Sequence, residues 1–338
     1  MSEDDPNNQL AQVEHGALAL TSLADNRILS EMVSTSLVLA NESAVAPVDL
    51  DALVREAKRL YRSMGDGMTE ENIRAFKLFL RAAVAGHAEA QNYLATCYDD
   101  GEGVSEDYVE AIKWYRKSAE QGNAHAQYNL GRSYRLGTIV PKDYTEAVSW
   151  FLKAAAVGNT GAQSALADAY RYGKGVPKDC EEAARWFRLA AEQGQVHSQV
   201  MLGNFYTTGE GVPRNIEQAA EWFRRAADQG SAVAQLRLGQ YYYSGKCVPQ
   251  DYAEAIKWYR MAAEQGDYLA QYNLALSYHY GRGVPIDIPQ AYKWYRLLAD
   301  IEHELGTREA KALAALMSSS EFAAASALYQ EFKDKVSE

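Results

Sequence analysis

Apolar and polar positions along this chain recur with a period of 36 residues over most of its length. In each period a leucine and a tyrosine stand four residues apart, which places both on one face of a helix. We therefore predict one helix per unit, helix A, built around this pair. The pairs are Leu94 with Tyr98, Leu130 with Tyr134, Leu166 with Tyr170, Leu202 with Tyr206, Leu238 with Tyr242, and Leu274 with Tyr278.

A second apolar stripe follows in every unit and predicts a second helix, helix B. In the first clear unit it consists of Ala111, Trp114, Tyr115 and Ala119, which lie on one helical face. The tryptophan of this stripe is expected to fill the space between helices, so Trp186→Ala should cost roughly 3–5 kcal/mol of stability. All six tryptophans of the chain occupy this slot: Trp114, Trp150, Trp186, Trp222, Trp258 and Trp294.

Glycine and capping residues separate the two helices. A glycine after helix A suits a left-handed C-terminal cap, at Gly101, Gly137, Gly173, Gly209, Gly245 and Gly281. Asp or Asn then occupies the N-cap slot of helix B, at Asp107, Asp143, Asp179, Asn215, Asp251 and Asp287. A Glu or Gln three residues later completes the sequence pattern of a capping box in every unit.

A fixed period of this length predicts a stack of copied helix pairs, because one pair cannot bury its own apolar stripe. The expected fold class is all-α, a right-handed superhelical solenoid of antiparallel helix pairs. We expect four segments: an N-terminal helical extension and linker at 1–46, a degenerate first repeat at 47–85, six repeats of 36 residues at 86–302, and C-terminal capping helices at 303–338.

These slots resemble the Sel-one-like repeat, a relative of the tetratricopeptide repeat. The run from Ala126 to Gly131, followed by Tyr134, Gly137 and Trp150, carries the resemblance. Two units depart from it, with Ile139 and Cys247 replacing the second loop glycine. The resemblance implies adaptor work: scaffolding complexes, assembling membrane or secretion machinery, regulating signalling, or engaging host proteins. It implies no shared catalytic residue and fixes no partner.

Composition narrows the class of partner. The net charge of −11 argues against general nucleic-acid binding and against an anionic membrane surface. Cys97, Cys180 and Cys247 fall in three different repeat slots, which suits a reducing compartment. The acidic N-terminus is unlike a secretory signal, and no apolar run approaches 18 residues. A cytoplasmic location without membrane insertion is expected, which leaves secretion without a signal peptide open.

No catalytic or metal-binding constellation stands out in the sequence. The six histidines include no pair with helical ligand spacing, and neither H-E-x-x-H nor C-x-x-C occurs. Gly-x-Gly elements such as Gly173-Lys174-Gly175 recur as turns and lack a preceding strand. We expect neither an enzyme nor a cofactor.

Information about a partner should lie in the slots that vary between units. By analogy with tetratricopeptide arrays, one face of each helix A lines a concave wall, and Arg and Tyr dominate interface hot spots. The sharpest hypothesis is a central zone of Tyr128, Arg132, Arg135, Arg171 and Tyr172 that recognises an acidic segment of a protein partner. The alternative is that Asp168 neutralises these arginines in a local ion-pair network. Further candidates for contact are Asn204 and Gln240, as clamps on a peptide backbone, and Tyr243, Tyr272, His279 and Tyr280.

Two functions follow from this pattern. The first is a non-enzymatic adaptor or scaffold that holds a protein or peptide on its concave face. The second is a regulatory or immunity-type subunit that controls one specific enzyme and docks through its N-terminal helices. Residues 7–42 have an amphipathic pattern that suits a cap, self-association or partner docking. Deleting residues 1–46 should spare an adaptor but abolish an N-terminally docked regulator.

Overall fold

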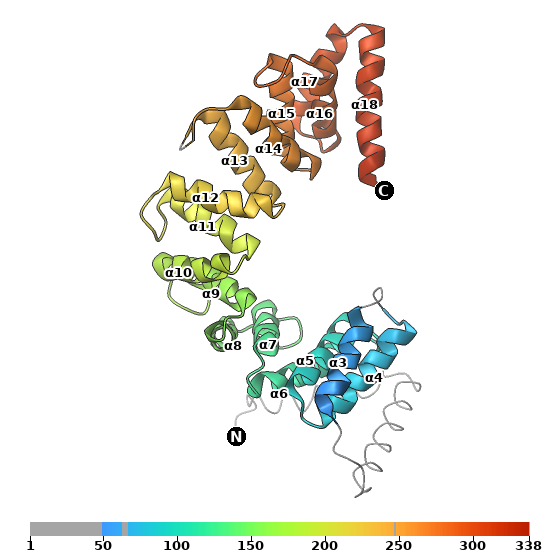
Figure 1. Cartoon of the computed structure of the whole chain (residues 1–338), viewed down its shortest axis with the longest axis vertical. Helices are drawn as coiled ribbons and strands as arrows, with labels where there is room; N and C mark the ends of the chain where they lie inside the picture. Colours follow the sequence, from blue (N-terminus) through green and yellow to red (C-terminus); the bar gives the residue numbers. More distant parts are fainter. Residues whose placement is uncertain (1–48, 63–66, 247, 338) are drawn as a thin grey trace, which may run out of the picture. The chain divides into compact units, whose positions relative to one another are not determined.

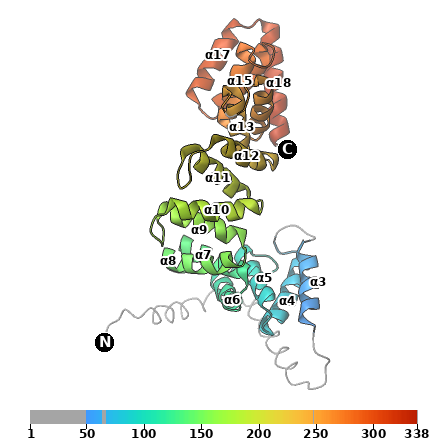
Figure 2. The ribbon, with the colours of Figure 1, turned by 60° about the vertical axis from the view of Figure 1, so that its left-hand side comes forward.

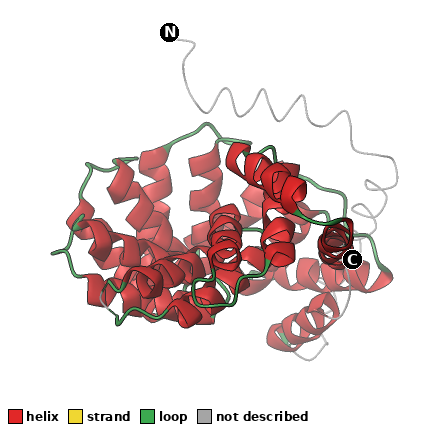
Figure 3. Ribbon diagram, turned by 90° about the horizontal axis from the view of Figure 1, so that it is seen from above, coloured by secondary structure: helices red, strands yellow, loops and turns green. Residues whose placement is uncertain are grey.

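The computed structural model of the protein describes residues 49–62, 67–246 and 248–337. Throughout these ranges the regular structure is helical and strands are absent (Figure 3). This confirms the predicted fold class, an all-α solenoid of antiparallel helix pairs. The expected N-terminal extension, with its predicted helices at 7–42, and Cys247 lie outside the described residues.

The chain divides into two compact units, Met1–Ser118 and Ala119–Glu338. Figure 1 labels the helices. In the first unit α3 packs on α4, and α4 packs on α5. The helices of this part are α3 (Leu50–Arg62), α4 (Glu70–Val84), α5 (Ala88–Asp100) and α6 (Tyr108–Glu120).

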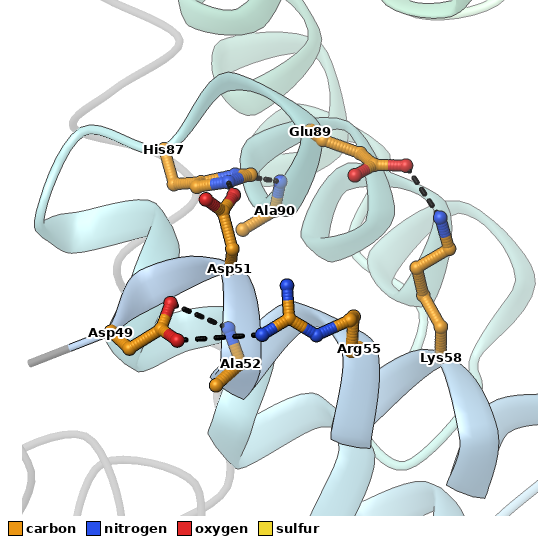
Figure 4. A network of polar contacts seen from close by, with 8 residues as sticks. All are labelled: Asp49, Asp51, Ala52, Arg55, Lys58, His87, Glu89 and Ala90. Atoms are coloured by element: carbon orange, nitrogen blue, oxygen red, sulfur yellow. Dashed lines mark hydrogen bonds and ion pairs between the residues drawn. The ribbon is translucent and has the colours of Figure 1, made fainter.

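A polar network ties α3 to the start of α5 (Figure 4). His87 Nε2 lies 2.9 Å from Asp51 Oδ1, while His87 Nδ1 accepts from the backbone N–H of Ala90. The bond to His87 lowers the pKa of Asp51. Lys58 Nζ lies 2.7 Å from Glu89 Oε1. Asp51 and His87 are 36 residues apart, which is the spacing expected if α3 is the helix A of the predicted degenerate first repeat.

In the second unit each helix packs on the next one along the chain from α7 to α17 (Figures 1 and 2). The last helix, α18, instead packs against α16. The helices are α7 (Ala124–Leu136), α8 (Tyr144–Ala156), α9 (Thr160–Tyr172), α10 (Cys180–Glu192), α11 (Val196–Thr208), α12 (Ile216–Asp228), α13 (Ala232–Ser244), α14 (Tyr252–Glu264), α15 (Tyr268–Tyr280), α16 (Ile288–Asp300), α17 (Glu304–Leu316) and α18 (Ser319–Ser337).

The predicted caps are present, with one correction. The glycine that ends each helix A is left-handed, as at Gly173 with φ 66°. The Asp or Asn at the start of helix B accepts from the backbone two or three residues on, as Asp179 does from Glu182. The reciprocal half of the capping box is replaced, because the backbone N–H of Asp179 donates to the carbonyl of Tyr170 at 2.9 Å. This bond recurs in every clear unit and fixes the loop between the helices.

A ladder of glutamines joins consecutive units. Gln163 Nε2 donates to the carbonyl of Ala155 at 3.4 Å, and Gln163 Oε1 accepts from Gln193 Nε2 at 2.9 Å. The same arrangement occurs at Gln199 with Gln229 and at Gln235 with Gln265. Two rungs lack the donor glutamine, because Val157 and Ile301 stand in its slot opposite Gln127 and Gln271. The buried Gln127 Oε1 has no hydrogen-bond partner.

The tryptophan slot is less buried than predicted. Trp150, Trp258 and Trp294 are buried, but Trp114, Trp186 and Trp222 are only half-buried, so the expectation of a uniformly buried slot was wrong. The ring that fills the core is the next residue, at 0% exposure in Phe187 and Phe223. Tryptophan lies at the edge of helix B, often under a cation, as Lys153 Nζ lies 3.7 Å from the Trp150 ring centroid.

Candidate functional site

A cavity of about 350 Å³ opens between α7, α8 and α9 in the second unit. We call it the α7–α9 pocket. Its floor is apolar and includes Val148, Phe151 and Ala165. Its polar side chains come from α7, the start of α8, α9 and the loops before α8 and after α9: Arg135, Lys142, Tyr144, Asp168, Tyr172 and Lys174.

The loop after α9 is held against the start of α8 by a close backbone approach. A Cβ added to Gly175 would lie 2.2 Å from the carbonyl oxygen of Tyr144, so only glycine fits, and its φ of +77° is also left-handed. This contact positions the neighbouring Lys174, whose Nζ lies 5.6 Å from the ring centroids of both Tyr144 and Tyr172. Two aromatic rings therefore flank one ammonium group at the rim.

Positive charge dominates the pocket. Three cations, Arg135, Lys142 and Lys174, share it with one carboxylate, Asp168. A hydrogen bond with Lys142 lowers the pKa of the Tyr144 phenol, and the charges of Lys142, Lys174 and Arg135 act in the same direction. In the described chain, no carboxylate lies within ion-pair distance of any of the three cations, and the buried Arg135 Nε has no hydrogen-bond partner.

Asp168 does not neutralise the predicted arginines through a salt bridge. Its Oδ2 lies 3.8 Å from His197 Nε2 instead. Arg171 turns toward α11, where it contacts Met201 Sδ at 3.8 Å and Glu210 at 3.9 Å. Of the two remaining arginines, Arg135 lines the pocket and Arg132 lies outside it.

The central zone expected from sequence is therefore divided. Arg135, Asp168 and Tyr172 meet at the α7–α9 pocket, where Tyr172 is 57% exposed. Tyr128 lies against Phe151 with the Arg132 guanidinium 5.9 Å from its ring centroid. The five residues Tyr128, Arg132, Arg135, Arg171 and Tyr172 do not line one cavity.

A second group of candidates gathers on α13 and α15. Tyr243 accepts a hydrogen bond from Arg282 and lies edge-on to Tyr252 at 5.0 Å. His279 stacks on Tyr280, with ring centroids 4.4 Å apart. Tyr272 lies 6.1 Å from the rings of Tyr295 and His303. This group is already engaged in contacts with its own neighbours.

The two proposed backbone clamps lie between these groups. Asn204 is half-buried on α11. Gln240 on α13 accepts from Arg237 Nη1 at 3.2 Å through its Oε1 atom. The Gln240 side-chain amide is thus partly occupied by its own helix.

Sequence reasoning missed Lys142, Tyr144 and Lys174. Lys142 and Lys174 stand in the loops between helix A and helix B, and Tyr144 is the first residue of a helix B. The sequence pattern marks these slots only as turn and capping positions. A signal was available, because these slots also vary between units: position 174 is Lys where the following unit has Glu210.

The described residues give little support to a reactive thiol, a metal site or a membrane-spanning helix. Burial raises the pKa of the Cys97 thiol to about 12, and desolvation with a hydrogen bond to Glu210 raises the pKa of Cys180, which disfavours a reactive thiolate. Across residues 49–62, 67–246 and 248–337, His, Cys, Asp and Glu form no group of three that could hold a metal ion. Among the helices of these ranges, none has the length and apolar character needed to span a bilayer.

The sequence matches the family profile described as Sel1 repeat at residues 57–87, 88–123, 124–159, 160–195, 196–231, 232–267 and 269–303. The chain belongs to the Sel1 repeat family. This confirms the resemblance noted in the sequence.

Solved structures support the same assignment. The chain is 33% identical to a protective antigen of uropathogenic Escherichia coli strains displaying an SLR fold, with a TM-score of 0.74 over 84% of this chain. It spans 62% of the length of that antigen. It is 34% identical to a Sel1 repeat protein from Oxalobacter formigenes, with a TM-score of 0.65, covering 73% of this chain and 99% of that one. A comparison with curated proteins returns no match.

Proposed function

We propose that this Sel1 repeat protein is a non-enzymatic scaffold or adaptor that binds a protein or peptide on the helix A surface of residues 119–338. The family generally mediates protein–protein interaction. The observation that supports this surface is the exposure of its aromatic residues. Tyr172 and Tyr280 hold the same slot three units apart and are 57% and 56% exposed.

Neither tyrosine is needed to close the core. The buried slots of leucine and of the ring on helix B already fill the space between helices, as at Leu166 and Phe187, both at 0% exposure. Exposed tyrosines beside cations are the residue types that carry binding energy in protein interfaces. Lys174 lies beside Tyr172, and the Arg282 guanidinium lies 5.6 Å from the Tyr280 ring centroid.

Site-specific photocrosslinking in the native organism tests this proposal. A benzoylphenylalanine replaces Tyr172 or Tyr280 on the helix A surface, or Leu152 or Met261 on helix B as exposed controls. We expect the first pair to crosslink one discrete protein and the second pair to crosslink none. Crosslinks from Leu152 and Met261 alone would place the partner on the other surface.

The same experiment in a chain lacking residues 1–46 separates the adaptor from a subunit that docks through its N-terminal segment. An adaptor keeps its crosslinks from positions 172 and 280. Loss of both crosslinks, with the helical array still folded by circular dichroism, would assign the binding to the N-terminal segment instead.

A further inference from the structure

We infer that the α7–α9 pocket is a subsite for a carboxylate of the protein partner, with an adjacent apolar side chain of that partner on the pocket floor. The inference rests on the proposed function and deepens it. The carboxylate belongs to a glutamate, an aspartate or a chain end, and Arg135, Lys142 and Lys174 bind it.

Charge is the first argument. The pocket gathers three cations around one carboxylate, in a chain whose net charge is −11. Asp168 is directed to His197, and the cations have no acidic partner within the described residues. A charged donor that is buried without a partner costs free energy, and a ligand oxygen at Arg135 would remove that cost.

Repetition supplies the second argument, because the same slots occur again in the next unit, where the arginine has an acidic partner. Arg171 holds the slot of Arg135, and Glu210 holds the slot of Lys174. Glu210 lies 3.9 Å from Arg171 and also accepts from Cys180 Sγ at 3.3 Å. The loop after α11 supplies an acid to Arg171, whereas the equivalent loop after α9 supplies a lysine to the pocket of Arg135.

The copy two units beyond Arg171 is filled from within the array. Tyr243 replaces the arginine and bonds to Arg282, while Gln250 Nε2 donates to Tyr252 Oη at 3.0 Å and to the carbonyl of Tyr243 at 2.9 Å. These four side chains therefore have internal hydrogen-bond partners. Of these copies, only the α7–α9 pocket combines lysines with an arginine in the Arg135 slot that lacks an acidic partner within the described residues.

Size and residual charge favour a carboxylate next to an apolar side chain. About 350 Å³ is at the small end of ligand sites and suits one or two side chains. Val148 and Phe151 offer an apolar floor, and Arg135 can bind a carboxylate through a planar pair of N–H groups. Asp168 disfavours a doubly charged phosphate more than a singly charged carboxylate.

Peptide binding to the full chain tests the inference. The probe is a fluorescein-labelled peptide of alternating leucine and glutamate, compared with versions in which glutamine or phosphoserine replaces glutamate. We expect the glutamate peptide to bind at least tenfold more tightly than the glutamine peptide. The double variant Lys142→Ala with Lys174→Ala should lose at least tenfold in affinity and most of this preference.

A matched control removes the same charge elsewhere. Lys178 and Lys246 occupy the Lys142 and Lys174 slots in later units and lie outside the pocket, so Lys178→Ala with Lys246→Ala should change affinity less than threefold. An equal loss in both double variants would show general charge attraction and overturn the subsite. Equal or absent binding of the glutamate and glutamine peptides would also overturn it, as would tighter binding of phosphoserine.

Lys174→Glu gives a second variant that should stay folded, since the next unit already carries an acid in that slot at Glu210. We expect it to abolish the glutamate preference without lowering the melting temperature. Retained preference would overturn the inference. Crosslinks from Tyr172 that persist in this outcome would leave the proposed function standing without its carboxylate subsite.

Discussion

The loop after α9 and the loop after α11 share one backbone and differ in charge. Gly173 and Gly209 are left-handed in both, and the N–H of the cap residue donates to a tyrosine carbonyl at 2.9 Å in both. Position 174 is Lys in the first loop, whereas its counterpart in the second is Glu210. The arginine beside the first loop stays without an acidic partner, and the one beside the second gains a carboxylate.

This difference separates the slots that build the array from the slots that set its local charge. Constant slots, such as the left-handed glycine and the glutamine ladder, hold the helices together. Loop slots change the local charge without altering the backbone. A single substitution should therefore open or close a pocket while the array keeps its stability.

The largest expected effect is on stability and comes from removing a buried aromatic ring of the core. Phe187 on α10 is fully buried and lies edge-on to Phe205 at 5.5 Å, between α9 and α11. Phe187→Ala should lower the free energy of unfolding by about 3–5 kcal/mol, as expected for loss of a buried ring. Urea unfolding measures this loss. Trp186→Ala should cost at least about 1 kcal/mol less, because Trp186 is only half-buried. A larger loss at Trp186 would contradict the assignment of the core ring.

The next effect concerns the close approach that positions Lys174. Gly175→Ala forces a Cβ against the Tyr144 carbonyl in a left-handed backbone, which should cost about 1–3 kcal/mol from strain alone. Gly158→Ala is the matched control, since Gly158 is also left-handed but its Cβ would meet nothing within 4 Å. Thermal unfolding of both variants should show the greater loss at Gly175. Equal losses would mean that the loop relaxes away from α8.

Much of the fold could be predicted because its determinants are local. The glycine and Asp caps act within a few residues of sequence, and the period of 36 predicted the helix pairs from α5 to α16. Whether each arginine has an acidic partner could not be predicted from its own slot. Arg135 and Arg171 look equivalent in sequence, and they differ because of residues 39 positions further on, Lys174 and Glu210. The burial of the tryptophan slot was wrongly predicted for a similar reason, since residue identity alone does not show which of two adjacent rings points into the core.

Replacing the acid of the second loop by a cation should create a second site. Glu210→Lys removes the partner of Arg171 and should create a second site, so that binding of the leucine–glutamate peptide rises from one to two per chain by calorimetry. At this second position the variant should bind the peptide at least tenfold more tightly than the parent chain does, a difference of about 1.4 kcal/mol in binding free energy. Glu217→Lys, an exposed position on α12, is the control for net charge.

Cys180 gives an independent check on the Glu210→Lys substitution. A hydrogen bond from Cys180 to Glu210 contributes to the raised pKa of its thiol, second to desolvation. Replacing the acid by a cation should lower this pKa and speed alkylation by iodoacetamide at pH 8. An unchanged alkylation rate in Glu210→Lys would mean that position 210 does not face Cys180 and Arg171 in solution.

The smallest expected effect restores one missing rung of the glutamine ladder. Val157 is 69% exposed at the end of α8, where its counterparts Gln193, Gln229 and Gln265 donate to the preceding glutamine. Val157→Gln supplies a donor to the buried, unpartnered Gln127 Oε1, so it should stabilise the array by about 0.5–1.5 kcal/mol, the usual net value of one hydrogen bond. Thermal unfolding measures the gain. The gain should disappear when Val157→Gln is introduced into the Gln127→Ala variant and compared with Gln127→Ala alone, because the added amide then has no acceptor. A gain that survives in the double variant would assign the effect to helix propensity at position 157 and would leave the ladder without a role in joining these two units.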